Sequence, residues 1–283
     1  MPSLRTLLVL GRTSNLPTVW SNCLAAWWLG GGVQLGALAG VLLGTTLLYL
    51  GGMYLNDAFD AGFDAQYRRE RPIPSGAISA GQVWLIGLSL LLAGELVLLA
   101  VGGPTPRLGV FLILAILLYD AVHKLITLSP ILMAACRFLL YLVAASAGLD
   151  GVTGLAVWSA FALAFYIVGL SYIARKESNR GALRYWPCLC LGAPVGLALL
   201  VNANQYRETA IWLSIVLALW VARCLRHTFG AVDRNIGRTV SGLLAGIAWV
   251  DLLAVANCRR EMAAVFIVLF FGAILGQRFV PAT

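Results

Sequence analysis

Long apolar runs separated by short polar turns fill most of this sequence. Runs such as 108–118, 154–170, 211–222 and 263–275 lie in apolar stretches close to the roughly 20 residues that a helix needs to cross a bilayer. Most of these stretches are apolar on all sides, whereas a surface helix of a soluble protein is apolar on one face only. The pattern predicts ten helical spans, or nine with one re-entrant or surface segment. They cover residues 16–32, 35–55, 80–101, 107–124, 130–148, 153–174, 185–201, 208–226, 238–257 and 261–280.

The composition supports a chain that is surrounded by membrane lipid. Hydrophobic residues make up 60% of the 283 positions and charged residues 11%, whereas soluble domains carry about 25% charged residues. No low-complexity linker or polar appendage interrupts the apolar spans. The sequence therefore predicts an all-α fold, a polytopic transmembrane bundle of nine or ten helices in which residues 1–283 form a single domain.

Basic residues are distributed unevenly between the two sides of the predicted spans. With the N-terminus in the cytoplasm, 15 of the 20 Lys and Arg residues fall on the inner side, four fall on the outer side, and Arg137 falls within a span. This bias is the positive-inside pattern of membrane proteins. It predicts an integral protein of the inner or plasma membrane with residues 56–76 facing the cytoplasm. Because topology accounts for the net charge of +8, we expect no nucleic-acid partner.

A polar segment with regularly spaced oxygen ligands follows the second predicted span. Asn56, Asp60 and Asp64 are four residues apart, so their directions drift by only about 80° around a helix and they share one side. Carboxylates this close repel one another unless a cation lies among them. Oxygen ligands with open positions suit Mg²⁺, which also keeps water and binds substrate phosphate. We therefore expect Asn56, Asp60 and Asp64 to be Mg²⁺ ligands.

Three arginines, Arg68, Arg69 and Arg71, follow these acids. The forked donors of arginine match the oxygens of a phosphate group. Acidic ligands followed by arginines therefore predict a site for a metal-bridged diphosphate. The alternative is a solvated loop in which acids and arginines neutralise one another, but an ordinary loop does not hold three ligands in helical phase at the end of a span.

The segment Asn56–Asp64, followed by Arg71-Pro-Ile-Pro-Ser-Gly76, resembles the first aspartate-rich motif of the UbiA superfamily of intramembrane prenyltransferases. The resemblance extends loosely over the whole chain, with two spans before the motif and four between it and the next polar loop. It implies a UbiA prenyltransferase-like helical fold and transfer of a prenyl group from a Mg²⁺-bound polyprenyl diphosphate to an acceptor. Tyr119 and Lys124 resemble positions that steady the diphosphate in this family, although Lys124 would equally suit a side chain that extends to the membrane surface.

The loop after the sixth predicted span departs from the family pattern. Family members usually carry a second aspartate-rich motif there, whereas this chain has Arg175 and Lys176 where acids are expected, and Glu177 is the only acid. We expect Tyr172, Arg175 and Lys176 to contact the diphosphate directly in place of a second metal clamp. The sequence Tyr-Ile-Ala-Arg-Lys-Glu looks most like the EboC-like branch of the superfamily.

Several polar or charged residues lie inside predicted spans. An arginine in the membrane is costly and usually faces a cavity or a partner, so we expect Arg137 to contribute to the diphosphate site. Asn22 would line the same cavity or, as we favour, make hydrogen bonds between helices. Glu95 and Asp251 lie deep in the third and ninth spans. Each could contact an acceptor or, as we favour, pair with a polar group across the bundle.

Together these residues predict a Mg²⁺-dependent prenyltransferase that acts on a polyprenyl diphosphate and a small aromatic or cyclitol-like acceptor. Asp60 and Asp64 would hold the metal, Lys124 would neutralise the diphosphate, and Glu177 or Asp120 would take up the acceptor proton. Two alternatives are a non-catalytic prenyl-lipid carrier that uses the same pocket and a secondary transporter with acids as ion sites at mid-membrane. The position of the acidic cluster at the end of a span disfavours the transporter.

Overall fold

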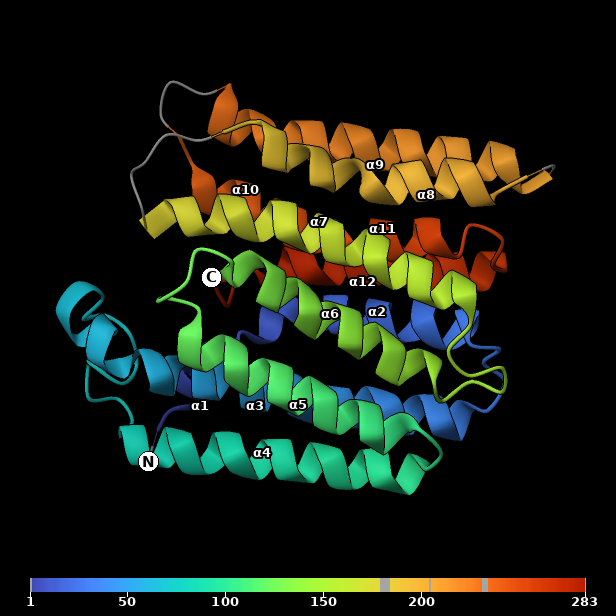
Figure 1. The fold of residues 1–283 in the computed structure, drawn as a ribbon. Helices are drawn as coiled ribbons and strands as arrows, with labels where there is room; N and C mark the ends of the chain where they lie inside the picture. Colours follow the sequence, from blue (N-terminus) through green and yellow to red (C-terminus); the bar gives the residue numbers. More distant parts are fainter. Residues whose placement is uncertain (1, 179–183, 204, 231–233, 283) are drawn as a thin grey trace.

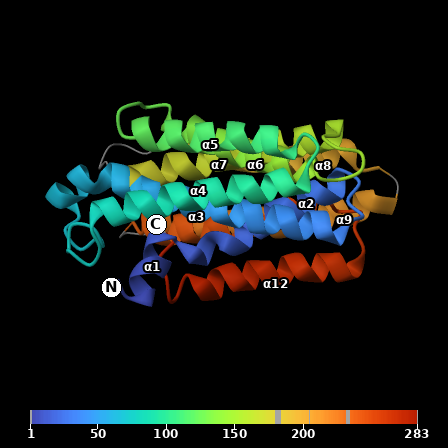
Figure 2. The same cartoon turned by 90° about the horizontal axis from the view of Figure 1, so that it is seen from below.

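The computed structural model describes residues 2–178, 184–203, 205–230 and 234–282, and these residues form helices and loops without a strand. The long helices lie side by side with their axes roughly parallel (Figure 1). In the view turned by 90°, α5 and α12 lie on opposite sides of the bundle (Figure 2). The all-α bundle that the sequence predicts is therefore what the described residues form.

Each of the ten predicted spans coincides with helical structure. The segments are α1 (Leu4–Leu10), η1 (Thr13–Asn15), α2 (Leu16–Leu29), α3 (Leu35–Tyr67), α4 (Ala80–Val101), α5 (Thr105–Val122), α6 (Ser129–Ala145), α7 (Gly154–Ser178), η2 (Trp186–Gly192), α8 (Ala193–Val201), α9 (Gln205–Phe229), α10 (Ile236–Ala245), α11 (Ile247–Ala254) and α12 (Arg260–Gly276).

The predicted count of nine or ten helices is not confirmed. Gly246 is both the last cap of α10 and the first cap of α11, so these two segments form one span and the described residues hold eleven helices. The additional helix is α1, whose seven residues are too few to cross a bilayer. Six helices in the described part of the chain are long and apolar enough to do so, namely α3, α4, α5, α7, α9 and the joined α10 and α11.

Local sequence accounts for several helix ends. Proline stands in the first turn of α2, α5, α6 and α8, where its missing N–H costs no helical hydrogen bond. Ser79 and Gln82 form a reciprocal capping box at the start of α4, which satisfies two backbone donors. Gly102 ends α4 with a φ of 84°, a conformation that strains any residue with a side chain.

Helix α3 is longer than predicted and carries the acidic motif on its last turns. It has 33 residues and is therefore about 50 Å long, whereas the hydrocarbon core of a bilayer is about 30 Å thick. The helix thus exceeds the core thickness by about 20 Å, and residues 56–67 form its polar end. The predicted helical phase of Asn56, Asp60 and Asp64 is confirmed.

Close packing against α4 holds α3 in place. A Cβ added at Gly51 of α3 would lie 2.9 Å from the carbonyl oxygen of Gly87 in α4. Likewise, a Cβ added at Gly94 of α4 would lie 2.8 Å from the carbonyl oxygen of Gly44. Glycines at a helix crossing allow the two backbones to approach closely within a membrane. The row of Asn56, Asp60 and Asp64 at the end of α3 is therefore carried by a firmly packed helix.

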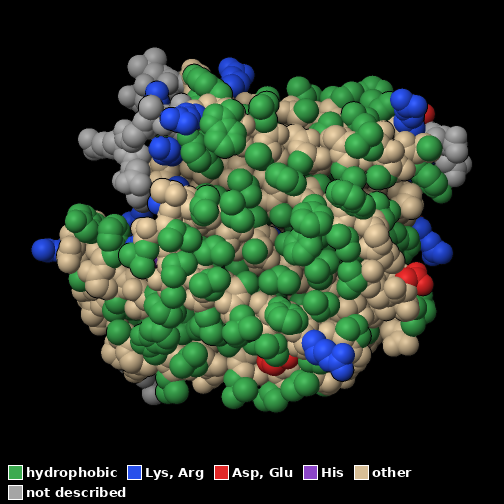
Figure 3. Space-filling view, viewed as in Figure 1, with side chains coloured by type: hydrophobic (Ala, Val, Ile, Leu, Met, Phe, Trp, Pro, Cys, Tyr) green, Lys and Arg blue, Asp and Glu red, His purple; other side chains and the backbone are tan. Residues whose placement is uncertain are grey.

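The outer surface is apolar between the two ends of the bundle. Hydrophobic side chains cover most of the face in Figure 3, and basic side chains lie mainly along its left and right edges. Leu85, Leu92 and Phe111 point outward with exposed fractions of 69%, 63% and 58%. A patch of this extent suits contact with lipid rather than with water.

Candidate functional site

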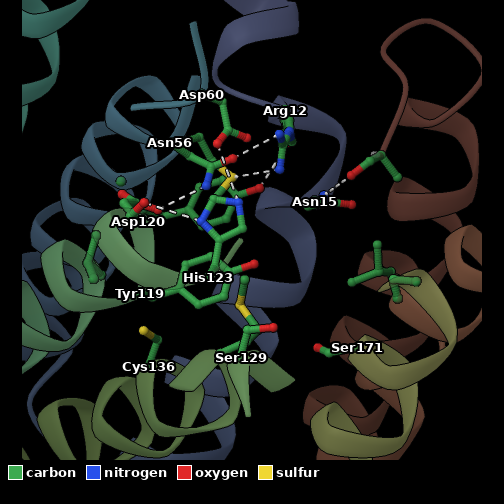
Figure 4. A pocket seen from close by; sticks show the side chains of 18 of the residues that line it. Arg12, Asn15, Asn56, Asp60, Tyr119, Asp120, His123, Ser129, Cys136 and Ser171 are labelled. Atoms are coloured by element: carbon green, nitrogen blue, oxygen red, sulfur yellow. Dashed lines mark hydrogen bonds and ion pairs between the residues drawn. The ribbon is translucent and has the colours of Figure 1, made fainter. Parts of the chain in front are cut away.

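A cavity of about 900 Å³ lies among α2, α3, α5, α6, α7 and α10. Its polar mouth is formed by the last turns of α3, the end of α5 and the loop that carries Arg12 (Figure 4). The walls deeper in the bundle are mostly apolar, apart from Arg137 and a few other polar side chains. The apolar part is formed by Val19, Leu48, Leu112, Ile116, Met133, Leu140, Ile167, Leu170, Val240 and Leu244.

The structure brings most of the predicted site residues to this cavity. Asn56 and Asp60 line it, and Asp64 is buried one turn further along α3. The predicted diphosphate ligands in the cavity wall are Arg68, Arg71, Tyr119, Lys124, Arg137 and Arg175. Within the described residues, the predicted diphosphate ligands that do not line the cavity are Arg69, Tyr172 and Lys176.

Asp60 lies at the centre of the mouth and faces two residues from the end of α5. Its Oδ1 is 2.7 Å from Nζ of Lys124 and 3.5 Å from Nε2 of His123. The Lys124 ammonium also lies 3.8 Å from the centroid of the Phe63 ring. His123 stacks on Tyr119 with ring centroids 4.9 Å apart. The end of α5 therefore brings a cation and an imidazole onto the acidic side of α3.

Arg12 reaches the same end of α3 from the loop between α1 and η1. Its Nη2 donates hydrogen bonds to Oδ1 of Asn56 and Oδ1 of Asp57, each at 3.2 Å. Nη1 of Arg71 lies 3.7 Å from the same Asp57 oxygen. Asp57 thus anchors two guanidinium groups beside the ligand row instead of joining it.

These two guanidinium groups share one carboxylate. Burial lowers the pKa of Arg71, and nearby Arg12 lowers it further, although Asp57 raises it. Burial also acts to lower the pKa of Arg12, but the contribution of Asp57 makes the net shift upward. Arginine stays protonated at neutral pH, so the cluster has a surplus of positive charge that suits an anionic ligand.

Sequence reasoning did not assign Arg12 or His123 to the site. Arg12 lies 44 residues before Asn56, so no local pattern connects the two. In the described parts of the chain it is the only non-glycine residue with a positive φ, 40°, and residues held in this region are often functional. His123 does have a local signal, because it follows Tyr119 by one helical turn.

A second polar cluster lies deeper, where α2, α6 and α11 meet. Arg137 donates from Nη1 to Oδ1 of Asn22 at 2.7 Å and from Nη2 to Oγ1 of Thr18 at 3.2 Å. Asn22 donates from Nδ2 to Oδ2 of Asp251 at 2.7 Å, and Ser21 donates to the same oxygen. One amide thus links a buried cation to a buried carboxylate, which confirms the predicted helix–helix bonding of Asn22 and the pairing of Asp251 across the bundle.

Arg175, at the end of α7, holds the loop between α5 and α6. Its Nη1 donates to the carbonyl oxygen of Ile126 at 2.6 Å and to Oγ of Ser129 at 3.0 Å. The same loop contains Lys124, which contacts Asp60. Arg175 therefore connects the basic end of α7 to the acidic end of α3 through protein contacts.

Other predicted residues on the last turns of α7 lie beside the cavity. The Tyr172 hydroxyl accepts a hydrogen bond from the backbone N–H of Arg184 at 3.0 Å. Nζ of Lys176 lies 5.8 Å from the centroid of the Tyr172 ring. The side chain of Glu177 lies outside the described residues. The predicted roles of these residues toward a diphosphate stay predictions.

The donors at the mouth fit a Mg²⁺ ion that is shared with a substrate. Among the described residues, no group of three or more His, Cys, Asp and Glu side chains forms a metal site alone. Asp64 Oδ1 and Asp120 Oδ2 are buried and have no hydrogen-bond partner in the described structure, a costly state for a carboxylate. The carboxylates of Asp60 and Asp64 and the amide oxygen of Asn56 would leave coordination positions open for water and phosphate. Mg²⁺ accepts an incomplete protein ligand set of this kind.

Comparison with known protein families identifies the family of this chain. The sequence model of the UbiA prenyltransferase family matches residues 14–274. The chain belongs to the UbiA prenyltransferase family. The six long apolar helices among the described residues and this membership together make it an integral membrane protein.

Two curated relatives share shorter stretches with this UbiA-family chain. It is 37% identical over 117 residues to a digeranylgeranylglyceryl phosphate synthase from Ignicoccus hospitalis. This aligned stretch covers 41% of this chain and 37% of that protein. It is 33% identical over 99 residues to a 4-hydroxybenzoate octaprenyltransferase from Burkholderia pseudomallei, which is 34% of each chain. The match thus spans about a third of the length of these relatives.

Solved structures of UbiA homologues have the same fold. A homologue from Archaeoglobus fulgidus bound to GPP and Mg²⁺ aligns with a TM-score of 0.65 at 15% identity, over 95% of this chain and 99% of that chain. A structure from a study of digeranylgeranylglyceryl phosphate synthase in membranes aligns with a TM-score of 0.62 at 17% identity, over 96% and 99%. At these identities the alignments show the fold, which extends over nearly all of both chains.

The Arg175 contacts of this UbiA-family chain give a testable expectation. Arg175→Ala is expected to speed amide hydrogen exchange at residues 125–128 about fivefold. The substitution removes the hydrogen bond to the Ile126 carbonyl oxygen, and one such bond is worth about 1 kcal/mol. Hydrogen-exchange mass spectrometry of the purified protein measures this rate. Lys176→Ala is the matched control, since Lys176 lies over Tyr172 of its own helix. Equal exchange in the Arg175→Ala variant and the native chain would show that Arg175 does not hold the loop.

Proposed function

We propose that this chain is a Mg²⁺-dependent intramembrane prenyltransferase that transfers a polyprenyl group from its diphosphate to a small aromatic or cyclitol-like acceptor. The observation that carries the proposal is a single cavity with a charged mouth and an apolar interior. A polyprenyl diphosphate has the same division, with an anionic head and an apolar tail. Family membership and the names of the relatives, a synthase and an octaprenyltransferase, support this reading.

Asn56, Asp60 and Asp64 are the proposed Mg²⁺ ligands. They lie on one side of the last turns of α3, and the unpaired Oδ1 of Asp64 supports a cation at this end of the helix. When bound, Mg²⁺ would offset charge on the phosphate oxygens and improve the diphosphate as a leaving group. Lys124, which pairs with Asp60 in this structure, is close enough to the ligand row to contact the diphosphate as well.

Arginines are the proposed partners of the remaining diphosphate oxygens. Arg68 and Arg71 line the mouth, and Arg12 joins them from the N-terminal loop. Cationic donors that are fixed before the reaction stabilise the charge that develops on a leaving group. Tyr119, Arg137 and Arg175 line the cavity beyond this group. We include them as further contacts to the diphosphate or to the first isoprene unit.

The proposed reaction breaks the bond between C1 of the prenyl group and the diphosphate oxygen, and the electron pair leaves with the diphosphate. A nucleophilic atom of the acceptor then bonds to C1 and loses its proton, for which Glu177 is the proposed base. The apolar walls of the cavity exclude water, which would otherwise trap the allylic cation.

Purified protein with radiolabelled polyprenyl diphosphates and a pool of small acceptors tests this proposal. We expect diphosphate release and a labelled product in Mg²⁺, and neither when EDTA is added in excess. A panel of prenyl chain lengths covers the unknown tail, and the labelled product identifies the acceptor. Absence of release with every chain length and acceptor would overturn the proposal, and so would release that persists in EDTA.

A non-catalytic prenyl-lipid carrier is the second candidate. The basic pair at positions 175 and 176, where the family resemblance leads us to expect acids, and the ion pair that occupies Asp60 both favour it. A carrier would retain the labelled diphosphate in the cavity and release none of it. The same assay therefore separates the two candidates.

We also propose that the charged mouth faces the cytoplasm, in agreement with the positive-inside bias. The loop between α3 and α4 and the loop between α6 and α7 lie at opposite ends of the bundle (Figure 1). In intact cells, Asp150→Cys is therefore expected to react with a membrane-impermeant maleimide, whereas Ser75→Cys reacts only after lysis. Both positions are exposed, and the native cysteines are buried or half-buried. The reverse labelling pattern would place the mouth on the outer side.

A further inference from the structure

Asp120 is a buried carboxylate of the cavity wall to which the proposed reaction gives no necessary role. It lies near the end of α5 and is 4% exposed. Its Oδ1 accepts a hydrogen bond from Nδ2 of Asn56 at 3.0 Å, and its Oδ2 has no hydrogen-bond partner in the described structure (Figure 4). The oxygen Oδ1 of Asn56 also accepts a hydrogen bond from Arg12. The Asn56 amide is therefore bound at both ends, with its nitrogen to Asp120 and its oxygen to Arg12.

We infer that Asp120 is a positioning residue that fixes the orientation of the Asn56 amide, so that its oxygen and not its nitrogen is presented to a divalent cation. The inference rests on the proposed function and adds a residue that acts through Asn56. It assigns Asp120 no contact with the reacting atoms.

The chemistry of the three groups permits only one orientation of the amide. An ionised carboxylate only accepts hydrogen bonds, a guanidinium only donates them, and an asparagine amide has one end of each kind. With Asp120 on one side and Arg12 on the other, the amide nitrogen faces the carboxylate and the oxygen faces the guanidinium. A flipped amide would set oxygen against oxygen and N–H against N–H.

A fixed orientation matters because only the amide oxygen binds a hard cation. Mg²⁺ takes oxygen ligands, and an amide nitrogen that still carries its protons offers no lone pair to it. Partners that orient a metal ligand typically change metal affinity by about 10- to 100-fold when they are removed. Asp120 would thus supply at α5 an acidic group that supports the metal, in a chain whose α7 end is basic at 175 and 176.

The second oxygen of Asp120 supports the same role. A buried carboxylate oxygen without a donor is costly, and a purely structural partner for one amide would not require it. Asp120 lines the cavity, so the free oxygen is available to a donor that enters with the ligand, such as water. The two oxygens then serve different purposes, one fixed to Asn56 and one left for the occupied site.

Mn²⁺ binding to the purified full-length protein in detergent, measured by EPR titration without substrate, tests the inference. We expect Asp120→Leu to weaken Mn²⁺ binding about 10- to 100-fold. The exchanged pair Asn56→Asp/Asp120→Asn should return the affinity to within about threefold of the native value, since a carboxylate at 56 has two oxygens and needs no orienting partner. Glu95→Leu, which removes a carboxylate of α4 outside the cavity wall, is the control and should change nothing.

Thermal unfolding and size-exclusion profiles establish that each variant is folded. Native Mn²⁺ affinity in a folded Asp120→Leu protein would overturn the inference, and so would an exchanged pair that binds as weakly as Asp120→Leu. Absence of Mn²⁺ binding to the native chain would overturn it too. The proposed prenyl transfer is scored separately by diphosphate release, so a protein that binds Mn²⁺ through Asp120 and releases no diphosphate contradicts only the proposed function.

Discussion

The double variant Asp60→Asn/Asp64→Asn is expected to release diphosphate about 100- to 1000-fold more slowly than the native protein. Both substitutions keep the size of the side chain and remove the negative charge that would hold the cation. Loss of a group that stabilises charge in the transition state typically costs a factor of this size. Asp60→Asn also removes the anionic partner of Lys124, 2.7 Å away. Initial rates with saturating Mg²⁺ and a radiolabelled polyprenyl diphosphate measure the effect.

A second double variant serves as the matched control. Asp150→Asn/Glu261→Gln also removes two carboxylates, and both of these are exposed and lie outside the cavity wall. Its rate should equal that of the native protein within about twofold. If the Asp60→Asn/Asp64→Asn protein is folded and releases diphosphate at the native rate, the row on α3 does not hold the metal.

Asp251→Leu is expected to lower the free energy of unfolding by about 3–5 kcal/mol. Its carboxylate is fully buried and balances the charge of Arg137 through the Asn22 amide. Removing one member of a buried charged pair leaves the other without compensation, which typically costs this much. Denaturant unfolding in detergent micelles, followed by circular dichroism, measures the change.

The double variant Asp251→Leu/Arg137→Met is the control for this prediction. Replacing both charges with apolar side chains of similar size is often close to neutral, so most of the lost stability should return. A double variant that is less stable than Asp251→Leu would show that the two charges do not compensate each other. Native stability of Asp251→Leu would show that the cluster contributes nothing to the fold.

The fold could be predicted from the sequence because lipid imposes a simple length rule. Each apolar run near 20 residues became a helix at the predicted place, and the loop charges agreed with one orientation of the spans. The predicted apolar span ended at 55, whereas helix α3 continues to Tyr67, because its last turns are polar and follow the apolar run. The spacing of Asn56, Asp60 and Asp64 already showed that these turns continue the helix.

The site could be predicted only where its residues share a local pattern. The α3 row and the arginines after it are such a pattern, and most of these residues line the cavity. Arg12 and Asp120 reach Asn56 from 44 residues before it and 64 residues after it, distances that no periodicity spans. Arg175 lines the cavity, and its hydrogen bonds to the α5–α6 loop depend on how α6 and α7 pack.

An experimental structure with Mg²⁺ and an unreactive polyprenyl diphosphate analogue tests the central claim most directly. The account predicts the diphosphate at the mouth, with Mg²⁺ bound by the row from Asn56 to Asp64 and the arginines at 68 and 71 on the opposite oxygens. The prenyl chain should follow the apolar wall past Leu48 and Leu112. A diphosphate bound at the other end of the bundle, or a prenyl chain outside the cavity, would contradict the account.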